Sequence, residues 1–305
     1  PWIGCTEVSP GCDNCYARVL DGRYRYGGGV HWGAGVPRHR TAPSTWRHPI
    51  QLNKSAGEKR ERWTVFPSLC DPFDNEVPSE WRADLWQLIR ATPNLTWLLL
   101  TKRIGNAAKM IALAQGTGVQ SLPVVLPNVW LGASVVNQEE ADRDIPKLLA
   151  TPAAKRFVSY EPALGPIEWF GDGENFDGWD WLRGDRQEAD AGDAAGVGRG
   201  VAVVKTAKID WLIVGGESSQ GGAKARPFDI AWARQTVAQC KAAGVACFIK
   251  QLGSTAFEID PDPTHGAYNC GGDYKMRRAW LRLKDRAGAD PAEWPDDLRV
   301  QEVPT

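Results

Sequence analysis

Long apolar runs are absent from this sequence of 305 residues. A membrane-spanning helix needs about 20 consecutive apolar residues, whereas the longest candidates, such as Leu95 to Leu100, have the length of a strand. The first residues, Pro1 to Cys5, also lack the basic stretch and apolar run of a secretory signal peptide. We therefore interpret the beginning as a trimmed start, and we expect no membrane partner.

An even, dispersed set of cysteines is missing as well. Three of the seven cysteines crowd into eleven residues, at Cys5, Cys12 and Cys15, and the other four are scattered. A secreted scaffold held by disulfides would show an even number at wider spacings. We therefore expect a cytoplasmic protein whose clustered cysteines bind metal.

Two common catalytic patterns are absent too. The chain has four histidines, none within a partnered nucleophile motif, and its glycine-rich strings do not match a phosphate-binding loop.

The overall composition is that of a globular chain. With a net charge of -1, 43% hydrophobic residues and 24% charged residues, the chain can bury one large core or two smaller ones.

Six short, mostly continuous apolar runs indicate parallel strands that are covered on both faces. These predicted strands are Trp63–Ser68, Leu95–Thr101, Val129–Val135, Arg156–Glu161, Trp211–Gly215 and Val245–Lys250. Helical periodicity separates several of them, at Ser79–Arg90, Ile104–Ala114, Gln138–Leu149 and Phe228–Ala243. Such βα alternation predicts either a doubly wound sheet or a βα barrel.

Polar residues at the ends of the strands favour the barrel. Among those that end or follow the second to sixth strands are Lys102, Ser134, Glu161, Glu217 and Lys250. In βα barrels the carboxyl ends of the strands surround the active site. We therefore predict a partial (βα)6 barrel of the TIM type over residues 1–253, although any single polar residue could simply begin a loop.

Two segments lie outside this pattern. Residues 171–208 are rich in Gly, Asp and Ala, and their few apolar residues predict an inserted flexible loop or lid. Residues 254–305 are predicted to be an irregular C-terminal covering segment, with one helical piece around Met276 to Lys284.

The cysteine cluster has the pattern Cys5-x6-Cys12-x2-Cys15 on a loop that contains Pro10 and Gly11. Closely spaced thiolates on such a loop can converge on one soft metal centre. Iron–sulfur ligation is our preferred interpretation. A structural zinc site would need a fourth ligand from His31, His39 or a later cysteine, and three inert buried cysteines are the remaining alternative.

Several strings carry a family resemblance over residues 1 to about 253. They are Trp2-Ile3-Gly4-Cys5-Thr6, Ser9-Pro10-Gly11-Cys12-Asp13-Asn14-Cys15-Tyr16-Ala17, Leu99-Leu100-Thr101-Lys102-Arg103, Leu131-Gly132-Ala133-Ser134-Val135, Ser159-Tyr160-Glu161-Pro162, Val214-Gly215-Gly216-Glu217-Ser218, Ala225-Arg226-Pro227 and Phe248-Ile249-Lys250-Gln251. In order and spacing the chain resembles a phage-associated three-cysteine family, the phage protein of the gene-product thirty-seven / sixty-eight type. That family has no known function and is regarded as a relative of the radical S-adenosylmethionine (SAM) enzymes.

The resemblance implies a radical SAM-like partial barrel and a [4Fe-4S] cluster held by Cys5, Cys12 and Cys15. Two departures make SAM a weaker expectation than the cluster. The first gap between cysteines has six residues instead of three, and Asn14 stands where an aromatic residue usually precedes the last cysteine. The Gly-Gly-Glu string that meets the methionyl amine in radical SAM barrels follows the second strand there, but the fifth predicted strand here.

The resemblance also suggests cofactor-binding residues. Gly215, Gly216 and Glu217 form the Gly-Gly-Glu string. Glu217 and Glu161 are candidates for the amine or the ribose hydroxyls, Ser134 for the ribose or the carboxylate, and Lys102 or Lys250 for an anionic group. Ion pairing among these residues is the structural alternative.

A basic, aromatic segment follows the cysteines, from Tyr16 to Arg62. Ten Lys or Arg residues face three acidic ones there, with Tyr and Trp residues interleaved. Because cations neutralise phosphates and aromatic faces stack on bases, this segment could bind DNA or RNA. Phosphate contacts are predicted at Arg23, Arg25, Arg38 and Arg40; the alternative is an ordinary solvated loop.

Two functional hypotheses follow. The first is a radical SAM-like enzyme that takes electrons from a donor and acts on an unspecified substrate, such as a nucleic acid that it modifies or repairs. The second is a non-catalytic iron–sulfur or zinc protein that binds nucleic acid or a protein partner.

Overall fold

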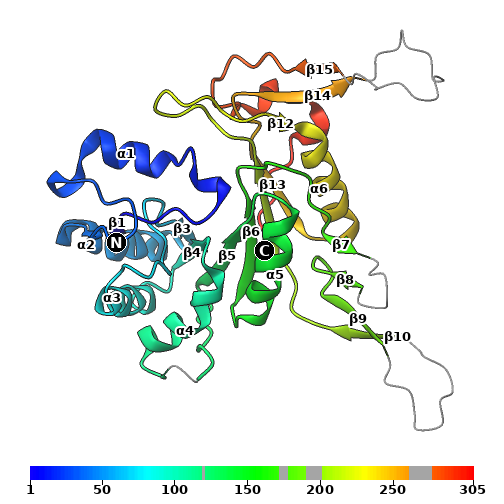
Figure 1. Ribbon diagram of the computed structural model, residues 1–305. Helices are drawn as coiled ribbons and strands as arrows, with labels where there is room; N and C mark the ends of the chain where they lie inside the picture. Colours follow the sequence, from blue (N-terminus) through cyan, green and yellow to red (C-terminus); the bar gives the residue numbers. More distant parts are fainter. Residues whose placement is uncertain (119–120, 172–177, 190–200, 261–276) are drawn as a thin grey trace, which may run out of the picture.

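The computed structural model describes all residues of the chain except 119–120, 172–177, 190–200 and 261–276. Its central element is a curled sheet of six parallel strands (Figure 1). The strands are β3 (Trp63–Val65), β4 (Leu95–Thr101), β5 (Val129–Ser134), β6 (Lys155–Tyr160), β11 (Trp211–Gly215) and β13 (Ala246–Gln251).

The strands neighbour one another in chain order, from β3 at one edge to β13 at the other. A doubly wound sheet would reverse its order at a switch point. The curled sheet is therefore a half-barrel, and the predicted parallel βα architecture is confirmed at this level. The first strand ends at Val65 instead of Ser68.

Helices lie around the outside of the half-barrel (Figure 1). They are α2 (Pro43–Lys59), α3 (Ser79–Arg90), α4 (Ile104–Gln115), α5 (Gln138–Ala150) and α6 (Ile230–Ala243). On α3, Leu85 and Ile89 lie one turn apart and are both fully buried, as expected for a helix that packs one apolar face on a sheet. Phe228 and Asp229, which we expected to begin α6, form the short strand β12 (Phe228–Asp229).

Local sequence signals explain where these helices begin and end. At the start of α5 the Asn137 side chain accepts from the backbone N–H of Glu140, and the Glu140 carboxylate accepts from the N–H of Val136. Gly116 and Gly244 end α4 and α6 with φ values of 76° and 65°, which an L side chain rarely adopts.

The predicted inserted loop is wrong in part, because short strands occupy much of its described length. β7 (Phe170–Gly171), β8 (Trp179–Asp180), β9 (Asp185–Ala189) and β10 (Val201–Lys205) form an antiparallel sheet between β6 and β11. The Trp179 and Trp181 rings stack at 3.8 Å, and Trp181 is 6% exposed. These two tryptophans pack the segment against the hydrophobic core, although its overall composition is rich in Gly and Asp.

The C-terminal segment also differs from the prediction. The expected helix around Met276 to Lys284 is wrong: Arg277–Trp280 form strand β15, which pairs with β14 (Ala256–Asp260), and Met276 lies outside the described residues. Short 3-10 turns follow at Pro291–Glu293 and Asp296–Leu298. Beyond them Gln301 forms an antiparallel bridge with Phe248, so the chain end covers part of the exposed edge of β13.

The N-terminal segment contains helices that were not predicted. The short strand β1 (Trp2–Ile3) pairs with β2 (His39–Arg40), and between them lie a 3-10 turn at Pro10–Cys12, the helix α1 (Tyr16–Tyr24) and a second 3-10 turn at Tyr26–Gly28. In Figure 1 this segment, in blue, lies beside the β3 half of the sheet. None of the helices in the described ranges is long and apolar enough to cross a membrane.

Gly132 offers a test of the packing inside the half-barrel. It lies on β5 opposite Phe157 of β6, and a Cβ at Gly132 would lie 2.3 Å from the ring carbon Cζ of Phe157. We expect Gly132→Ala to push this ring aside and to cost about 1–3 kcal/mol of unfolding free energy. Denaturant titration measures the loss.

The control is Gly105→Ala on α4, where the nearest atom lies 3.6 Å from the added Cβ, within ordinary contact distance. Because alanine favours helix, this variant should be neutral or slightly stabilising. Equal stability of the two variants would contradict the packing described for Phe157.

Candidate metal centre and adjoining cavity

The structure brings the five predicted polar residues to a single cavity. Lys102, Ser134, Glu161, Glu217 and Lys250 all line a space of about 500 Å³ at the carboxyl ends of the strands. Its deeper wall is apolar and includes Leu98, Leu100, Phe157 and Ile213. The cavity can therefore hold a molecule that has an apolar body and polar groups at one end.

A second cavity, of about 140 Å³, contains the cysteines. Cys5, Cys12 and Cys15 all line it, and so does Cys70 from the loop after β3. Cys15, Lys102 and Ser134 line both cavities, so the thiols lie beside the larger space. Within the described ranges, however, no three His, Cys, Asp or Glu side chains lie together at metal-binding distance.

The chemistry of this small cavity suits a soft metal centre. Four thiols surround it, while His31 and His39, which could have completed a zinc site, are not among its lining residues. His31 Nδ1 instead lies 3.0 Å from the buried carboxylate of Asp21. Burial raises the pKa of the Cys5 thiol to about 12, with a further contribution from Asp71 and an opposing one from Arg103. A bound metal would have to displace that proton.

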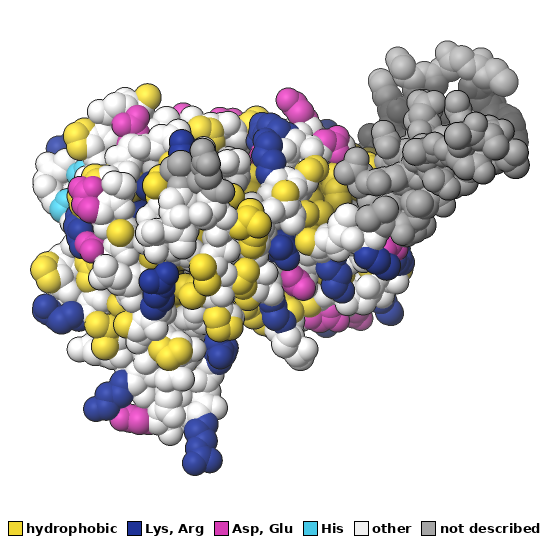
Figure 2. All heavy atoms as spheres, turned by 90° about the horizontal axis from the view of Figure 1, so that it is seen from below, with side chains coloured by type: hydrophobic (Ala, Val, Ile, Leu, Met, Phe, Trp, Pro, Cys, Tyr) yellow, Lys and Arg dark blue, Asp and Glu magenta, His cyan; other side chains and the backbone are white. Residues whose placement is uncertain are grey.

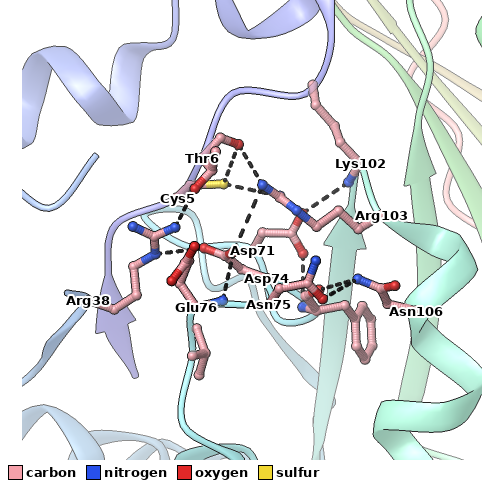
Figure 3. A network of polar contacts seen from close by, with 12 residues as sticks. Cys5, Thr6, Arg38, Asp71, Asp74, Asn75, Glu76, Lys102, Arg103 and Asn106 are labelled. Carbon is pink, nitrogen blue, oxygen red and sulfur yellow. Dashed lines mark hydrogen bonds and ion pairs between the residues drawn. The ribbon is translucent and has the colours of Figure 1, made fainter. Parts of the chain in front are cut away.

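Arg103 links the cysteine loop to the end of β4 (Figure 3). Its Nη1 donates to Cys5 Sγ at 3.4 Å and its Nη2 donates to the Thr6 carbonyl at 2.6 Å. The same guanidinium pairs with Asp71 at 3.0 Å. Burial lowers the pKa of Arg103, but Asp71 and Cys5 raise it by more, so Arg103 stays charged.

Two hydrogen-bonded groups form the polar wall of the larger cavity. Lys102 Nζ donates to Ser134 Oγ at 2.6 Å, and no carboxylate among the described residues pairs with this ammonium. Glu161 lies 3.1 Å from Lys250 Nζ and accepts from Ser159 Oγ at 3.2 Å. Lys102 is therefore the cation best placed to meet an anionic group between the two cavities.

Glu217 lines the larger cavity, but protein partners already engage both of its carboxylate oxygens. Arg226 Nη2 donates to Oε1 at 2.6 Å, and Asn14 Nδ2 donates to Oε2 at 2.8 Å. Arg226 Nη1 reaches the cysteine loop at the carbonyl of Pro10, at 2.8 Å. Burial raises the pKa of Glu217, but the hydrogen bonds from Arg226 and Asn14 hold it below its usual value. Glu217 thus ties the cysteine loop to the end of β11.

The two glycines of the Gly-Gly-Glu string allow close approach. A Cβ at Gly215 would lie 2.5 Å from Oε1 of Glu161, and a Cβ at Gly216 would lie 2.2 Å from the Leu252 carbonyl oxygen. Gly216 lines the larger cavity, whereas Gly215 is not among its lining residues. In this structure the first glycine therefore makes room for the Glu161 carboxylate.

The structure corrects one predicted phosphate contact. The Arg38 side chain is 0% exposed and donates to Asp74 at 2.7 Å, so it is a structural residue and cannot reach a phosphate. Arg40 pairs with Asp84 and lies 4.5 Å from the centre of the Trp46 ring. Of the four predicted arginines, Arg23 and Arg25 are exposed, at the end of α1.

A comparison of the whole sequence with protein families gives one assignment. Residues 1–287 match the family described as "Protein of unknown function (DUF5131)". The chain belongs to this family. No curated protein matches the chain. The family assignment of this DUF5131 chain names no activity, so its function must be argued from the site itself.

Sequence reasoning missed several residues of the site. Arg226 and Asn14 stood within the quoted motifs without a role, and Cys70 was one of the scattered cysteines. Cys70 is 65 positions from Cys5 in the chain, but its neighbour Leu69 accepts a backbone hydrogen bond from Gly4 at 3.2 Å. No local spacing signals such a contact, because it depends on β3 ending beside the N-terminal segment.

The assignment of Arg38 as a structural residue can be tested directly. Replacing Arg38 with Gln should lower the free energy of unfolding by about 3–5 kcal/mol, because the buried Asp74 carboxylate would lose its closest cation and keep only Arg103, at 3.9 Å. The matched change Arg23→Gln on exposed α1 should stay within about 0.5 kcal/mol of the parent. Urea denaturation measures both changes. If the Arg38 variant is as stable as the Arg23 variant, the assignment of Arg38 as a structural residue is wrong.

Proposed function

We propose that this DUF5131 chain holds a [4Fe-4S] cluster through Cys5, Cys12 and Cys15 and acts as a radical SAM-like enzyme. One observation carries the proposal: the three thiols line a small cavity that shares Cys15, Lys102 and Ser134 with a larger cavity at the mouth of the half-barrel. Catalytic sites of βα barrels occupy this end of the sheet. A cytoplasmic location belongs to the same proposal, because the thiols must stay reduced to bind the cluster.

The cluster would supply an electron, received from a donor protein, that cleaves a carbon–sulfur bond of bound SAM. The residues of the chain would bind and orient the reactants. Lys102 would bind the carboxylate of SAM, Ser134 and Glu161 would offer oxygens to the ribose hydroxyls, and the apolar wall with Phe157 would contact the apolar part of the ligand. Glu217 is less suited to bind the methionyl amine than we expected, because Arg226 and Asn14 already engage it.

Metal content provides the first test. Protein reconstituted anaerobically with iron and sulfide should bind about four of each, since thiolates in this arrangement suit a four-iron cluster. Cys12→Ala should lose the visible chromophore and most of the iron. Stoichiometric zinc with no iron after the same treatment would contradict the proposal.

Cys70 gives this test a matched control. It lines the same small cavity, yet the proposal leaves one iron without a protein thiolate. Cys70→Ser should therefore retain iron and sulfide at the parental level. Loss of metal in this variant would instead indicate four protein ligands.

SAM cleavage separates an enzyme from a binding protein. The reconstituted chain, given dithionite and SAM, should release 5′-deoxyadenosine and methionine in equal amounts. Replacing Lys102 with Gln should reduce the affinity for SAM, measured by equilibrium dialysis, while the iron content stays unchanged. A loaded cluster without SAM binding or cleavage would favour the non-catalytic alternative.

One specific observation supports the alternative of a non-catalytic zinc protein. Cys70 on the cavity wall supplies the fourth thiol that a structural zinc site with only cysteine ligands needs. Retention of zinc after anaerobic purification, together with loss of the fold on treatment with a chelator, would support it.

A nucleic-acid substrate is part of the proposal and rests on α1. This helix begins at Tyr16, directly after Cys15, and it ends with the exposed residues Arg23, Tyr24 and Arg25. Figure 2 shows one other face of the molecule, on which Lys and Arg side chains are interspersed with hydrophobic and acidic ones. We place the phosphate contacts at the end of α1, because Arg23 and Arg25 are the exposed members of the four predicted arginines.

Salt dependence tests this interaction. Replacing Arg23 and Arg25 together with Gln should weaken binding to single-stranded DNA or RNA and should reduce the salt slope by roughly one unit for each phosphate that is no longer neutralised. Lys109→Gln, at an exposed position on α4, is the control and should leave the slope unchanged. Fluorescence anisotropy measures both, and an absence of binding at about 50 mM salt would exclude nucleic acid from the proposal.

A further inference from the structure

We infer that Arg103 and Asp71 set the reduction potential of the cluster by acting in opposite directions on the sulfur of Cys5. The inference rests on the proposed function, since it concerns the cluster that Cys5 would help to hold. It adds two positioning residues beside the Cys5 ligand, to which the sequence analysis gave no role at the cluster. Figure 3 shows the polar network that contains both.

The first observation is the contact between Arg103 and the cysteine loop. Nη1 of Arg103 lies 3.4 Å from Cys5 Sγ, and Nη2 donates to the Thr6 carbonyl at 2.6 Å. The side chain of Arg103 is 9% exposed, so water screens its charge weakly. Among the hydrogen bonds of the described residues, neither Cys12 nor Cys15 receives one from a cation, which makes Cys5 the distinctive member of the set.

The second observation is that Arg103 is held in this position. Asp71 Oδ2 pairs with Nη1 at 3.0 Å, and the Asp74 carboxylate lies 3.9 Å from Nη2. Asp71 is itself fixed, because its Oδ1 accepts from Thr101 Oγ1 at 2.7 Å and from the Phe73 N–H at 2.9 Å. An arginine with partners on both sides keeps its N–H aimed at the sulfur with little loss of entropy on binding.

The carboxylate of Asp71 also faces the metal site. Asp71 lines the small cavity together with the cysteines, and it is 6% exposed. Its negative charge therefore opposes the positive charge of Arg103 at close range. Arg103 and Asp71 thus place opposite charges beside the Cys5 ligand. Neutralising either residue changes the net charge there in a known direction.

The physical consequence follows from charge. Reduction adds an electron to the cluster and its thiolates, so a cation and an N–H donor at a ligand sulfur favour the reduced form and raise the potential. A nearby carboxylate disfavours the reduced form and lowers the potential. Arg103 should therefore raise the potential and Asp71 should lower it.

The experiment measures the midpoint potential of the reconstituted full chain by electron paramagnetic resonance during a redox titration. Arg103→Gln should shift the reduction equilibrium at least about tenfold towards the oxidised cluster, which is about 59 mV more negative for one electron. Asp71→Asn, which keeps an acceptor for Thr101, should shift it in the opposite direction. Arg103→Lys keeps the charge but not the paired donors, so its shift should be smaller than that of the Gln variant.

Arg234→Gln serves as the control, because Arg234 also pairs with carboxylates but lies on α6. Its cluster should have the parental potential. If Arg103→Gln does not fold, the Asp71→Asn and Arg103→Lys variants still carry the test.

The outcomes distinguish this inference from the proposed function. Loaded clusters whose potentials are unchanged in the Arg103 and Asp71 variants, or that shift in the same direction, overturn the inference and leave the cluster intact. A parent chain that takes up no iron under anaerobic reconstitution overturns the proposed function, and the inference falls with it.

Discussion

The cysteine loop of this protein is held over the half-barrel by ion pairs at the carboxyl ends of two strands. Beyond β4, Arg103 pairs with Asp71 and bonds to Cys5 and Thr6. Beyond β11, Glu217 and Arg226 bond to Asn14 and Pro10. The loop contains little regular structure of its own, so without these contacts its thiols would have no fixed position relative to the cavity.

Such anchoring is energetically demanding. Charges that leave water cost several kcal/mol each unless partners replace the lost hydration. In the described structure Arg38, Arg103 and Arg226 each bond both to a carboxylate and to a backbone carbonyl. A network of this kind favours one arrangement of the loop, because moving the loop away would remove the bonds from the buried Arg103 guanidinium to Cys5 and Thr6.

The same arrangement explains how the site can combine polar and apolar chemistry. Parallel strands bring their carboxyl ends to one edge, so side chains from five strands meet at one cavity although they are far apart in the sequence. The apolar residues inside the half-barrel, among them Phe157 and Ile213, lie deeper in that cavity. The cysteine loop lies at its edge, where Cys15 contributes to both spaces.

The sequence alone determined the order of the six parallel strands and of the helices α3 to α6, because buried parallel strands are continuous apolar runs and β4 and β11 have the predicted bounds. It also determined which five polar residues line the cavity, since each ends or follows a strand. It failed at β7 to β9 and at β15, because these short strands lack the continuous apolar runs of the central sheet. Only the tertiary structure decided that Arg38 is buried, that Arg226 donates hydrogen bonds to Glu217 and that Cys70 lines the same cavity as the other thiols. Each of these depends on a partner at least 9 positions away in the chain. Burial and charge pairing are properties of the assembled neighbourhood, and no local pattern of residues specifies them.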